Sequence, residues 1–297
     1  MSNNTKRSFI SDIRYFGSNI KNESDLINLY NNDIFFKPHF SKDYPVINEI
    51  SGIMDGIDSR LKTRMSQLSL GIYQALQGGG ALNLSEDDEI HLFTAFAEIE
   101  TTDKIINDIM INESKLVSPT LFHNSVHNTP LGYFTIINKI HNYCTTISDG
   151  LETGYSFIEF INYKNLLQES LIVAAGDEYS SFYNLDKTVD FKLPPFFVSY
   201  KVTPSDKGYY LHSTYENKKD LIGELLHYNT IIVPGHEFDF FTSNLPGKII
   251  LTDYPITGDQ PTAIIARLAF PFSLQCKGET AVVEYSKRKY SLFNVRL

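Results

Sequence analysis

Residues 118–136 read SPTLFHNSVHNTPLGYFTI, and polar side chains crowd this segment just before it turns apolar. It contains two histidines four residues apart, and Pro130 with Gly132 breaks any long regular period. The pattern predicts neither a plain helix nor a plain strand. Because the segment leads into a buried element, its polar groups need hydrogen-bond partners inside the fold or across an interface.

Apolar strands alternate with helices on both sides of this segment. Buried strands are predicted at 90–99, 143–148 and 170–179, and helices at about 59–76 and at 153–167. Strands that are apolar throughout are typical of sheets covered by helices on both faces. The first part of the chain is therefore predicted to be α/β.

The alternation runs a second time from about residue 194. No Pro-, Gly- or Ser-rich linker separates the two runs, so the sequence predicts one fused body with halves at 1–190 and 191–297. The second run comprises a hairpin at 197–216, helices at 218–228 and 261–275, strands at 229–235 and 247–253, and two final strands at 280–297.

The charge balance limits the possible partners. The net charge is −9, and no basic stripe of the kind that binds nucleic acid is present. Two small basic clusters could receive an acidic partner such as an acyl carrier protein, although solvated charges are the favoured interpretation of both. These clusters are Arg60, Lys62 and Arg64, and Lys287, Arg288 and Lys289.

The two cysteines, Cys144 and Cys276, form no disulfide framework and suit a reducing cytosol. The first residues show no apolar stretch with a cleavage site, and no run reaches the length of a membrane span. We therefore expect a cytoplasmic protein without a transmembrane segment.

Motifs that carry chemistry are scarce. His123 and His127 lack a third ligand, and Pro130 interrupts the helix that a paired-histidine metal site needs. The three glycines at 78–80 end a helix and are followed by no Lys-Ser/Thr pair, so they predict no phosphate loop. Asp177 follows a buried strand, where a capped turn is favoured over a functional role. The residues alone therefore predict no metal, no cofactor and no complete catalytic group.

The segment at 117–136 resembles the one that precedes the nucleophile in β-ketoacyl synthases. The resemblance extends back through 59–76 and 93–110 and forward to 171–179, and it covers roughly residues 8–185. It implies a thiolase-like fold, with two similar halves in a five-layered α-β-α-β-α body and a shortened second half. It also implies that 143–148 and 170–179 are central strands of the first sheet.

The resemblance also implies where catalytic residues are missing. Aligned on the nucleophile segment, this chain has Leu151 at the nucleophile position and Glu152 next to it, and leucine cannot attack a thioester. His236 is the possible remnant of one family histidine. Asp259 stands where the second histidine is expected, and its negative charge would repel the developing enolate.

These departures predict a non-catalytic homologue similar to the chain-length-factor subunits of type II polyketide and aryl-polyene-like pathways. Such subunits pair with an active ketosynthase and shape its tunnel, and an acyl carrier protein takes part only indirectly. A homodimer is expected in the absence of the synthase. The candidate interface or tunnel residues are Ser125, His127, Asn128, Tyr133, Phe134, Thr146, Phe157 and Phe160. Core packing is an equal alternative for the four aromatic residues.

Two other functions stay open at this point. One is an enzyme of altered chemistry on acyl thioesters, a thioesterase or acyltransferase that uses Glu152, or His236 with Asp259. The other is a purely structural homodimeric scaffold whose pocket is filled.

Overall fold

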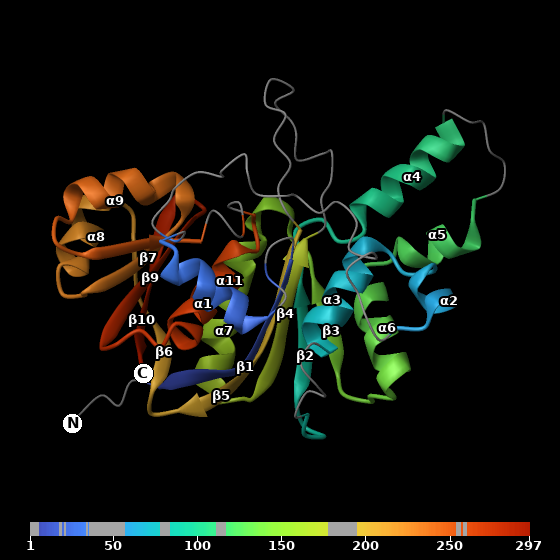
Figure 1. Ribbon diagram of the computed structural model, residues 1–297, viewed down its shortest axis with the longest axis horizontal. Coiled ribbons are helices and arrows are strands. Elements are labelled where there is room, and N and C mark those ends of the chain that lie inside the picture. The colour runs from blue at the N-terminus through green and yellow to red at the C-terminus, as the bar shows by residue number, and fades with distance from the viewer. Residues whose placement is uncertain are drawn as a thin grey trace.

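The computed structural model describes residues 6–17, 20, 22–33, 35, 57–77, 84–110, 117–177, 195–253, 257 and 260–297. Figure 1 shows the elements. In the first part these are β1 (Arg7–Gly17), α1 (Glu23–Asn31), α2 (Ser59–Lys62), α3 (Gln67–Gln77), β2 (Glu89–Phe93), α4 (Ile99–Met110), α5 (Pro119–Asn124), α6 (Thr129–Asn138), β3 (Cys144–Ile147), η3 (Gly150–Glu152), α7 (Thr153–Leu167) and β4 (Leu171–Asp177).

The second part continues from β5 (Phe196–Ser205) to the last strand. Its further elements are β6 (Gly208–Tyr215), α8 (Lys218–Leu225), β7 (Thr230–Val233), η5 (Gly235–Glu237), α9 (Phe238–Asn244), β8 (Ile249–Thr252), α11 (Ala263–Ser273), β9 (Glu279–Ser286) and β10 (Lys289–Arg296). None of the helices in the described ranges has the length and apolar character needed to cross a membrane.

The strands form two similar groups of five. They hydrogen-bond in the order β3-β2-β4-β5-β1-β6-β10-β9-β7-β8. We call the first five the first sheet and the last five the second sheet, because β1 and β6 meet only at the pair Ser8–Tyr209. Read from its free edge, the second sheet repeats the first with every strand number raised by five. In each sheet the three strands nearest the free edge run parallel to one another. The fourth strand is antiparallel to both of its neighbours, the third strand and the strand at the junction.

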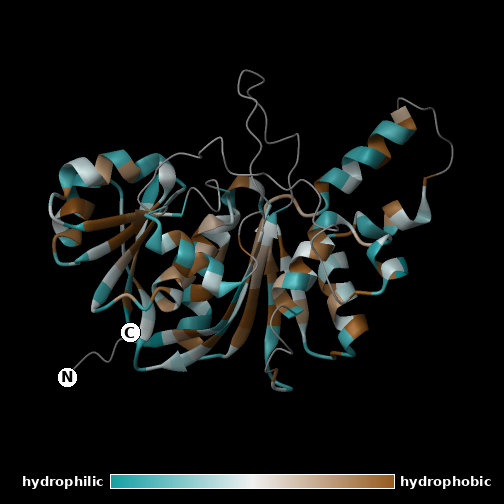
Figure 2. Ribbon diagram, viewed as in Figure 1, coloured by the Kyte–Doolittle hydropathy of each residue, from teal (hydrophilic) through white to brown (hydrophobic). Residues whose placement is uncertain are grey.

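Three apolar cores hold five layers together. Helices α3 and α6 cover the outer face of the first sheet, α7 and α11 lie between the sheets, and α8 and α9 cover the far face of the second sheet (Figure 1). Figure 2 shows the most hydrophobic colour on strands of both sheets. Representative core residues are Leu68 and Leu92 in the first core, Phe157, Val173 and Val282 in the second, and Leu221 and Ile231 in the third. The expected five-layered α-β-α-β-α body is confirmed.

The segment at 118–136 differs from the expectation, because it is helical over most of its length. Helices α5 and α6 fill it, and residues 125–128 connect them. The Ser118 hydroxyl accepts the Leu121 N–H at 3.4 Å, and Pro119 and Pro130 both lie in a first helical turn. A proline there removes no hydrogen bond, because the first N–H groups of a helix have no partner within it.

Two expected strand positions are also corrected. Strand β4 is the middle strand of the first sheet, but β3 lies at its edge and is not central. The predicted hairpin at 197–216 is absent, because β1 separates β5 from β6 and pairs with both. The turn at 206–207 thus carries the chain from the first sheet to the second. The expected boundary at 190–191 lies outside the described residues.

Candidate functional site

The turn between β3 and α7 presents Leu151 to solvent. Gly150 adopts a left-handed conformation with φ 57°, which glycine accepts without strain. The Ala95 carbonyl fixes this turn, since it accepts the Gly150 N–H and the Ser148 hydroxyl, each at 2.9 Å. Leu151 remains 70% exposed just before α7, a helix with one buried face.

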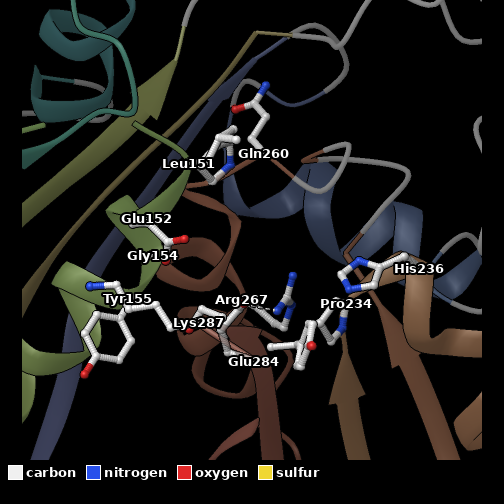
Figure 3. Close-up of a pocket in the computed structure, with 13 residues that line it drawn as sticks. Leu151, Glu152, Gly154, Tyr155, Pro234, His236, Gln260, Arg267, Glu284 and Lys287 are labelled. Carbon is white, nitrogen blue, oxygen red and sulfur yellow. Dashed lines mark hydrogen bonds and ion pairs between the residues drawn. The ribbon is translucent and has the colours of Figure 1, made fainter. Parts of the chain in front are cut away.

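A cavity of about 280 Å³ opens beside this turn, and both halves contribute to its wall. The adjacent residues Leu151 and Glu152 line it together with His236, which lies far from them in sequence (Figure 3). Asp259 lies outside the described residues, although the adjacent Gln260 contributes to the wall. The remaining lining residues are Gly154, Tyr155, Pro234, Pro261, Arg267, Glu284, Tyr285, Ser286 and Lys287.

A buried arginine forms the deep wall of the cavity. The guanidinium of Arg267, only 1% exposed, donates to both carboxylate oxygens of Asp253 at 2.9 and 3.1 Å. It also donates to Glu284 at 2.6 Å and to the Val283 carbonyl at 3.1 Å. Two carboxylates therefore balance one cation, and this arginine is not poised to hold a further anion. The sequence signal for it was a lone charge within the apolar helix AIIARLAF.

A tight turn between β9 and β10 brings basic side chains to the cavity mouth. Lys287 and Arg288 both have positive φ angles, 47° and 62°. The Lys287 ammonium group lies 4.1 Å from the centre of the Tyr155 ring, a cation–π contact between the two halves of the fold. Figure 3 shows Lys287 beside Tyr155, which lies in the first turn of α7.

Asp177 ties the two halves together beneath the cavity. Its carboxylate accepts the Thr94 hydroxyl at 2.8 Å, the Ala95 N–H at 2.7 Å and the Thr262 hydroxyl at 2.9 Å. Complete burial raises the pKa of this carboxyl to about 6, because burial penalises the ionised form more than these donors favour it. Sequence reasoning favoured a simple capped turn here and missed the link to Thr262.

Neither cysteine of the chain lines this cavity. The Cys144 thiol is half-buried on β3 and lies 3.3 Å from the Asn142 carbonyl oxygen, to which it donates. Cys276 follows α11 and lines a different hollow. Burial raises the pKa of both thiols, so the thiolate that would act as a nucleophile is disfavoured. Among the described residues, no cluster of three His, Cys, Asp or Glu side chains could hold a metal.

A model of a known protein family matches the part of the chain that contains the Leu151 turn. The model of the β-ketoacyl synthase N-terminal domain matches residues 54–218, which is more than half of the chain. The chain belongs to the β-ketoacyl synthase family. None of the curated protein sequences matches it significantly.

Solved structures show the same ketosynthase fold, which is thiolase-like. The ishigamide ketosynthase/chain length factor has a TM-score of 0.68 at 13% identity, covering 98% of this chain and 99% of that one. The ketosynthase ApeO in complex with its chain length factor ApeC, from Xenorhabdus doucetiae, has a TM-score of 0.62 at 15% identity, with 97% and 98% covered. A type II polyketide acyl-carrier protein in complex with its ketosynthase gives 0.65 at 11%, with 98% and 99% covered. At these identities the likeness shows the fold.

The candidate interface residues of this β-ketoacyl synthase homologue lie in several different environments. Ser125, His127 and Asn128 lie in the α5–α6 connection and are half-buried or exposed. Phe134 is buried in the first core and Phe157 in the second, so both pack inside the subunit.

Tyr133 and Phe160 are partly buried. The Tyr133 hydroxyl lies 3.1 Å from both the Arg64 carbonyl oxygen and Oδ1 of Asn124. The Phe160 ring packs on His91, with ring centres 4.6 Å apart.

Thr146 lies on the open edge of the first sheet. The Ile90 N–H donates to the Tyr143 carbonyl at 2.9 Å and the Thr94 N–H to the Ile147 carbonyl at 3.2 Å. Backbone groups alternate sides along a strand, so the N–H and C=O of Thr146 point away from β2. Its buried Oγ1 atom has no hydrogen-bond partner within the described residues.

Proposed function

We propose that this chain is a non-catalytic β-ketoacyl synthase homologue that acts as a chain-length-factor subunit in the cytoplasm. The observation that carries the proposal is Leu151, which occupies the exposed turn at the start of α7 beside the shared cavity. A carbon–carbon bond-forming synthase needs a nucleophile that can carry the acyl chain, and a leucine side chain cannot form a thioester. Neither thiol of the chain is close enough to the cavity to replace it.

The second-half residues at the cavity support the same proposal. A condensing enzyme stabilises an enolate with hydrogen-bond donors in a dry site. His236 is the one histidine that lines this cavity, and it is exposed to water. Glu152 and Glu284 bring two carboxylates to the wall, and both oppose the formation of a further negative charge.

An open sheet edge supports the role of a partner subunit. Strand β3 leaves backbone groups such as those of Thr146 unpaired on its outer side, and soluble proteins usually protect such edges. The described residues of this strand include no charge or proline that would do so. Pairing with the corresponding edge of a second ketosynthase fold would satisfy these groups.

Exposed apolar side chains continue this surface beyond β3. We call helices α4 and α5 the arm, since Figure 1 shows both at the end of the molecule away from the second half. We propose that the apolar side chains exposed on and near the arm form part of the interaction surface. The exposed apolar residues of the arm, of the α5–α6 connection, of α6 and of the residue before β3 are Ile106, Ile109, Met110, Phe122, Val126, Ile136 and Tyr143.

The expected partner is an active ketosynthase of a type II polyketide or aryl-polyene-like pathway. The solved structures with the same fold include ketosynthase and chain length factor complexes. The synthase would supply the nucleophile and receive the acyl carrier protein, and this chain would close the end of the tunnel. Without a synthase, the same edge would pair two copies of this chain.

Co-expression with any ketosynthase encoded beside its gene tests the proposal. We expect a one-to-one complex by size-exclusion chromatography and native mass spectrometry, and condensation of malonyl and acyl thioesters by the complex alone. Leu151→Ala should leave this activity unchanged, and replacing the synthase nucleophile should abolish it. A stable monomer that ignores the synthase would overturn the proposal.

A second outcome distinguishes the enzyme of altered chemistry. If Glu152, or His236 with Asp259, performs hydrolysis or acyl transfer, the isolated chain will turn over acyl thioesters. In that case Glu152→Gln or His236→Asn would abolish the turnover. A homodimer that binds no acyl chain and no synthase would instead indicate a structural scaffold.

A further inference from the structure

Two connections join the arm to the body of the subunit. A short loop, residues 94–98, leads from β2 into α4, and α5 contacts the junction between α2 and α3. The apolar side of α4 is largely exposed, and Thr101 is its one buried residue. Helix α5 is fastened to the junction by Asn124, whose Nδ2 donates to the Arg64 carbonyl. Helix α4 also packs against α5, so its attachment to the body runs through α5 as well as through its own first turn and the loop before it.

Glu98 makes that attachment. Its side chain is 1% exposed, and its Oε1 accepts the hydroxyls of Ser66 at 2.6 Å and Ser69 at 3.0 Å, both at the start of α3. Its Oε2 accepts the Thr101 hydroxyl at 3.2 Å, and its carbonyl accepts the N–H and hydroxyl of Thr102, each at 3.0 Å. One side chain thus joins the body, the loop and the first turn of α4.

This buried carboxyl has no ion-pair partner among the described cations. Lys104, one turn further along α4, lies 3.8 Å from Glu100 instead. Three neutral hydroxyls hold the charge of Glu98, and burial of an unpaired carboxylate is costly. Burial accordingly raises the pKa of Glu98 to about 7, although each of its three hydroxyl partners lowers it.

We propose that Glu98 is a proton-operated latch that fastens α4 to the body of the subunit. In the docked state the carboxyl prefers to hold its proton, and in a released α4 it is solvated and ionises more easily. Protonation therefore favours docking, and a rise in pH weakens the attachment. The latch goes beyond the proposed function, because it operates in the isolated chain.

Other titratable groups near Glu98 must also be considered as sources of a pH dependence. Tyr133 on α6 faces Glu98, and burial together with the Glu98 charge raises the pKa of this phenol, so it stays neutral below pH 8. The Arg64 guanidinium at the junction lowers the pKa of the same phenol, against the larger effect of burial. The His123 ring packs on Tyr133 with centres 5.7 Å apart and is the group that a control must exclude.

Hydrogen exchange of the α4 amides at pH 5 and pH 8, corrected for intrinsic rates, tests the latch. The docking constant should be roughly 10- to 100-fold lower at pH 8, because the released and docked states differ in proton affinity. Glu98→Gln imitates the protonated form and should give equal protection at both pH values. The β10 amides in the second sheet serve as the internal reference.

Two control variants separate Glu98 from its neighbours. Glu100→Gln removes a charge from the same helical turn, and His123→Asn removes the nearby imidazole, so both should keep the wild-type difference. Ser69→Ala removes one donor to the ionised carboxylate and should move the midpoint of the transition to higher pH. Protection of α4 that is equal at both pH values in the wild-type chain, or a difference that survives in Glu98→Gln, would overturn the proposal.

Discussion

The hydroxyl of Thr262 donates to Oδ2 of Asp177 over 2.9 Å, and this bond joins the end of β4 in the first half to the start of α11 in the second. The other carboxylate oxygen holds Thr94 and Ala95. Ala95 in turn fixes the turn that carries Leu151. One buried carboxyl thereby sets the relative positions of the two rims of the cavity.

Asp177→Asn should change how stability depends on pH. The folded-state pKa of about 6 exceeds the model-compound value of 3.8, so the wild-type carboxyl stabilises the fold most below pH 3.8. That contribution is lost as the pH rises through 6. Relative to the variant, the wild-type protein should lose up to roughly 3 kcal/mol across this window. Urea unfolding from pH 3.5 to 7 measures the difference, and a constant difference would contradict the burial argument.

Gly154→Ala should weaken the contact between α7 and α11. An added Cβ would lie 2.7 Å from the Pro261 carbonyl oxygen and 3.2 Å from Cγ2 of Ile264. We expect a loss of about 1–3 kcal/mol in the free energy of unfolding, measured by urea or thermal denaturation. Gly132→Ala in α6 is the matched control, because its Cβ meets nothing within 4 Å and should be neutral or slightly stabilising. Equal effects of the two changes would argue against the close approach.

Thr146→Pro should abolish dimer formation while the subunit stays folded. The lost N–H faces the open edge of the first sheet and not β2, so the internal ladder keeps its bonds. Light scattering with circular dichroism should show a folded monomer, or aggregate at high concentration. Thr146→Val keeps the N–H and removes a hydroxyl that has no partner, so it should dimerise as the wild type does. A proline variant that still forms dimers would exclude this edge as the interface.

Leu151→Cys should place a reactive thiol at the position that we propose to correspond to the family's nucleophile. The side chain is 70% exposed and precedes α7, whose N-terminal N–H groups favour a thiolate. Iodoacetamide should modify it on the order of tenfold faster than a thiol introduced by Leu166→Cys, which is exposed near the C-terminus of the same helix. Mass spectrometry gives both rates, with Cys144 and Cys276 as slow internal references. Equal rates would show that the helix start does not activate a thiol here.

Local sequence patterns predicted some helices and strands well, but the strand predicted at 90–99 is wrong in its second half, because β2 ends at Phe93 and α4 begins at Ile99. The helix at 153–167 has the predicted bounds, and β4 lies within the predicted 170–179. The pattern at 118–136 was misread, because prolines and polar residues that look disruptive are acceptable at the start of two short helices. A break at 63–66 likewise divides the predicted helix at 59–76 into α2 and α3.

Long-range arrangement could not be obtained from such patterns. The edge position of β3 and the insertion of β1 between β5 and β6 depend on pairing between residues that are distant in sequence. The spacing of apolar residues along one strand does not indicate which strand will pair with it. The same holds for the cavity, since Leu151 and His236 meet only once the two halves pack together. Family resemblance supplied their juxtaposition as an expectation. Neither a local pattern nor the family resemblance predicted the ion pairs of Arg267 or the hydrogen bond from Thr262 to Asp177.

The placement of β1 also governs when the first sheet can be completed during synthesis. Phe9 pairs with Thr203, so the first strand of the chain has its main partner almost two hundred residues later. At typical elongation rates that interval lasts roughly 10–40 s, during which the β1 segment has emerged from the ribosome and its partner has not. The parallel strands β2, β3 and β4 can pair with one another earlier, before β5 and then β1 are added on the side of β4. A chaperone that binds extended apolar segments would therefore find its longest opportunity at the β1 segment of the nascent chain.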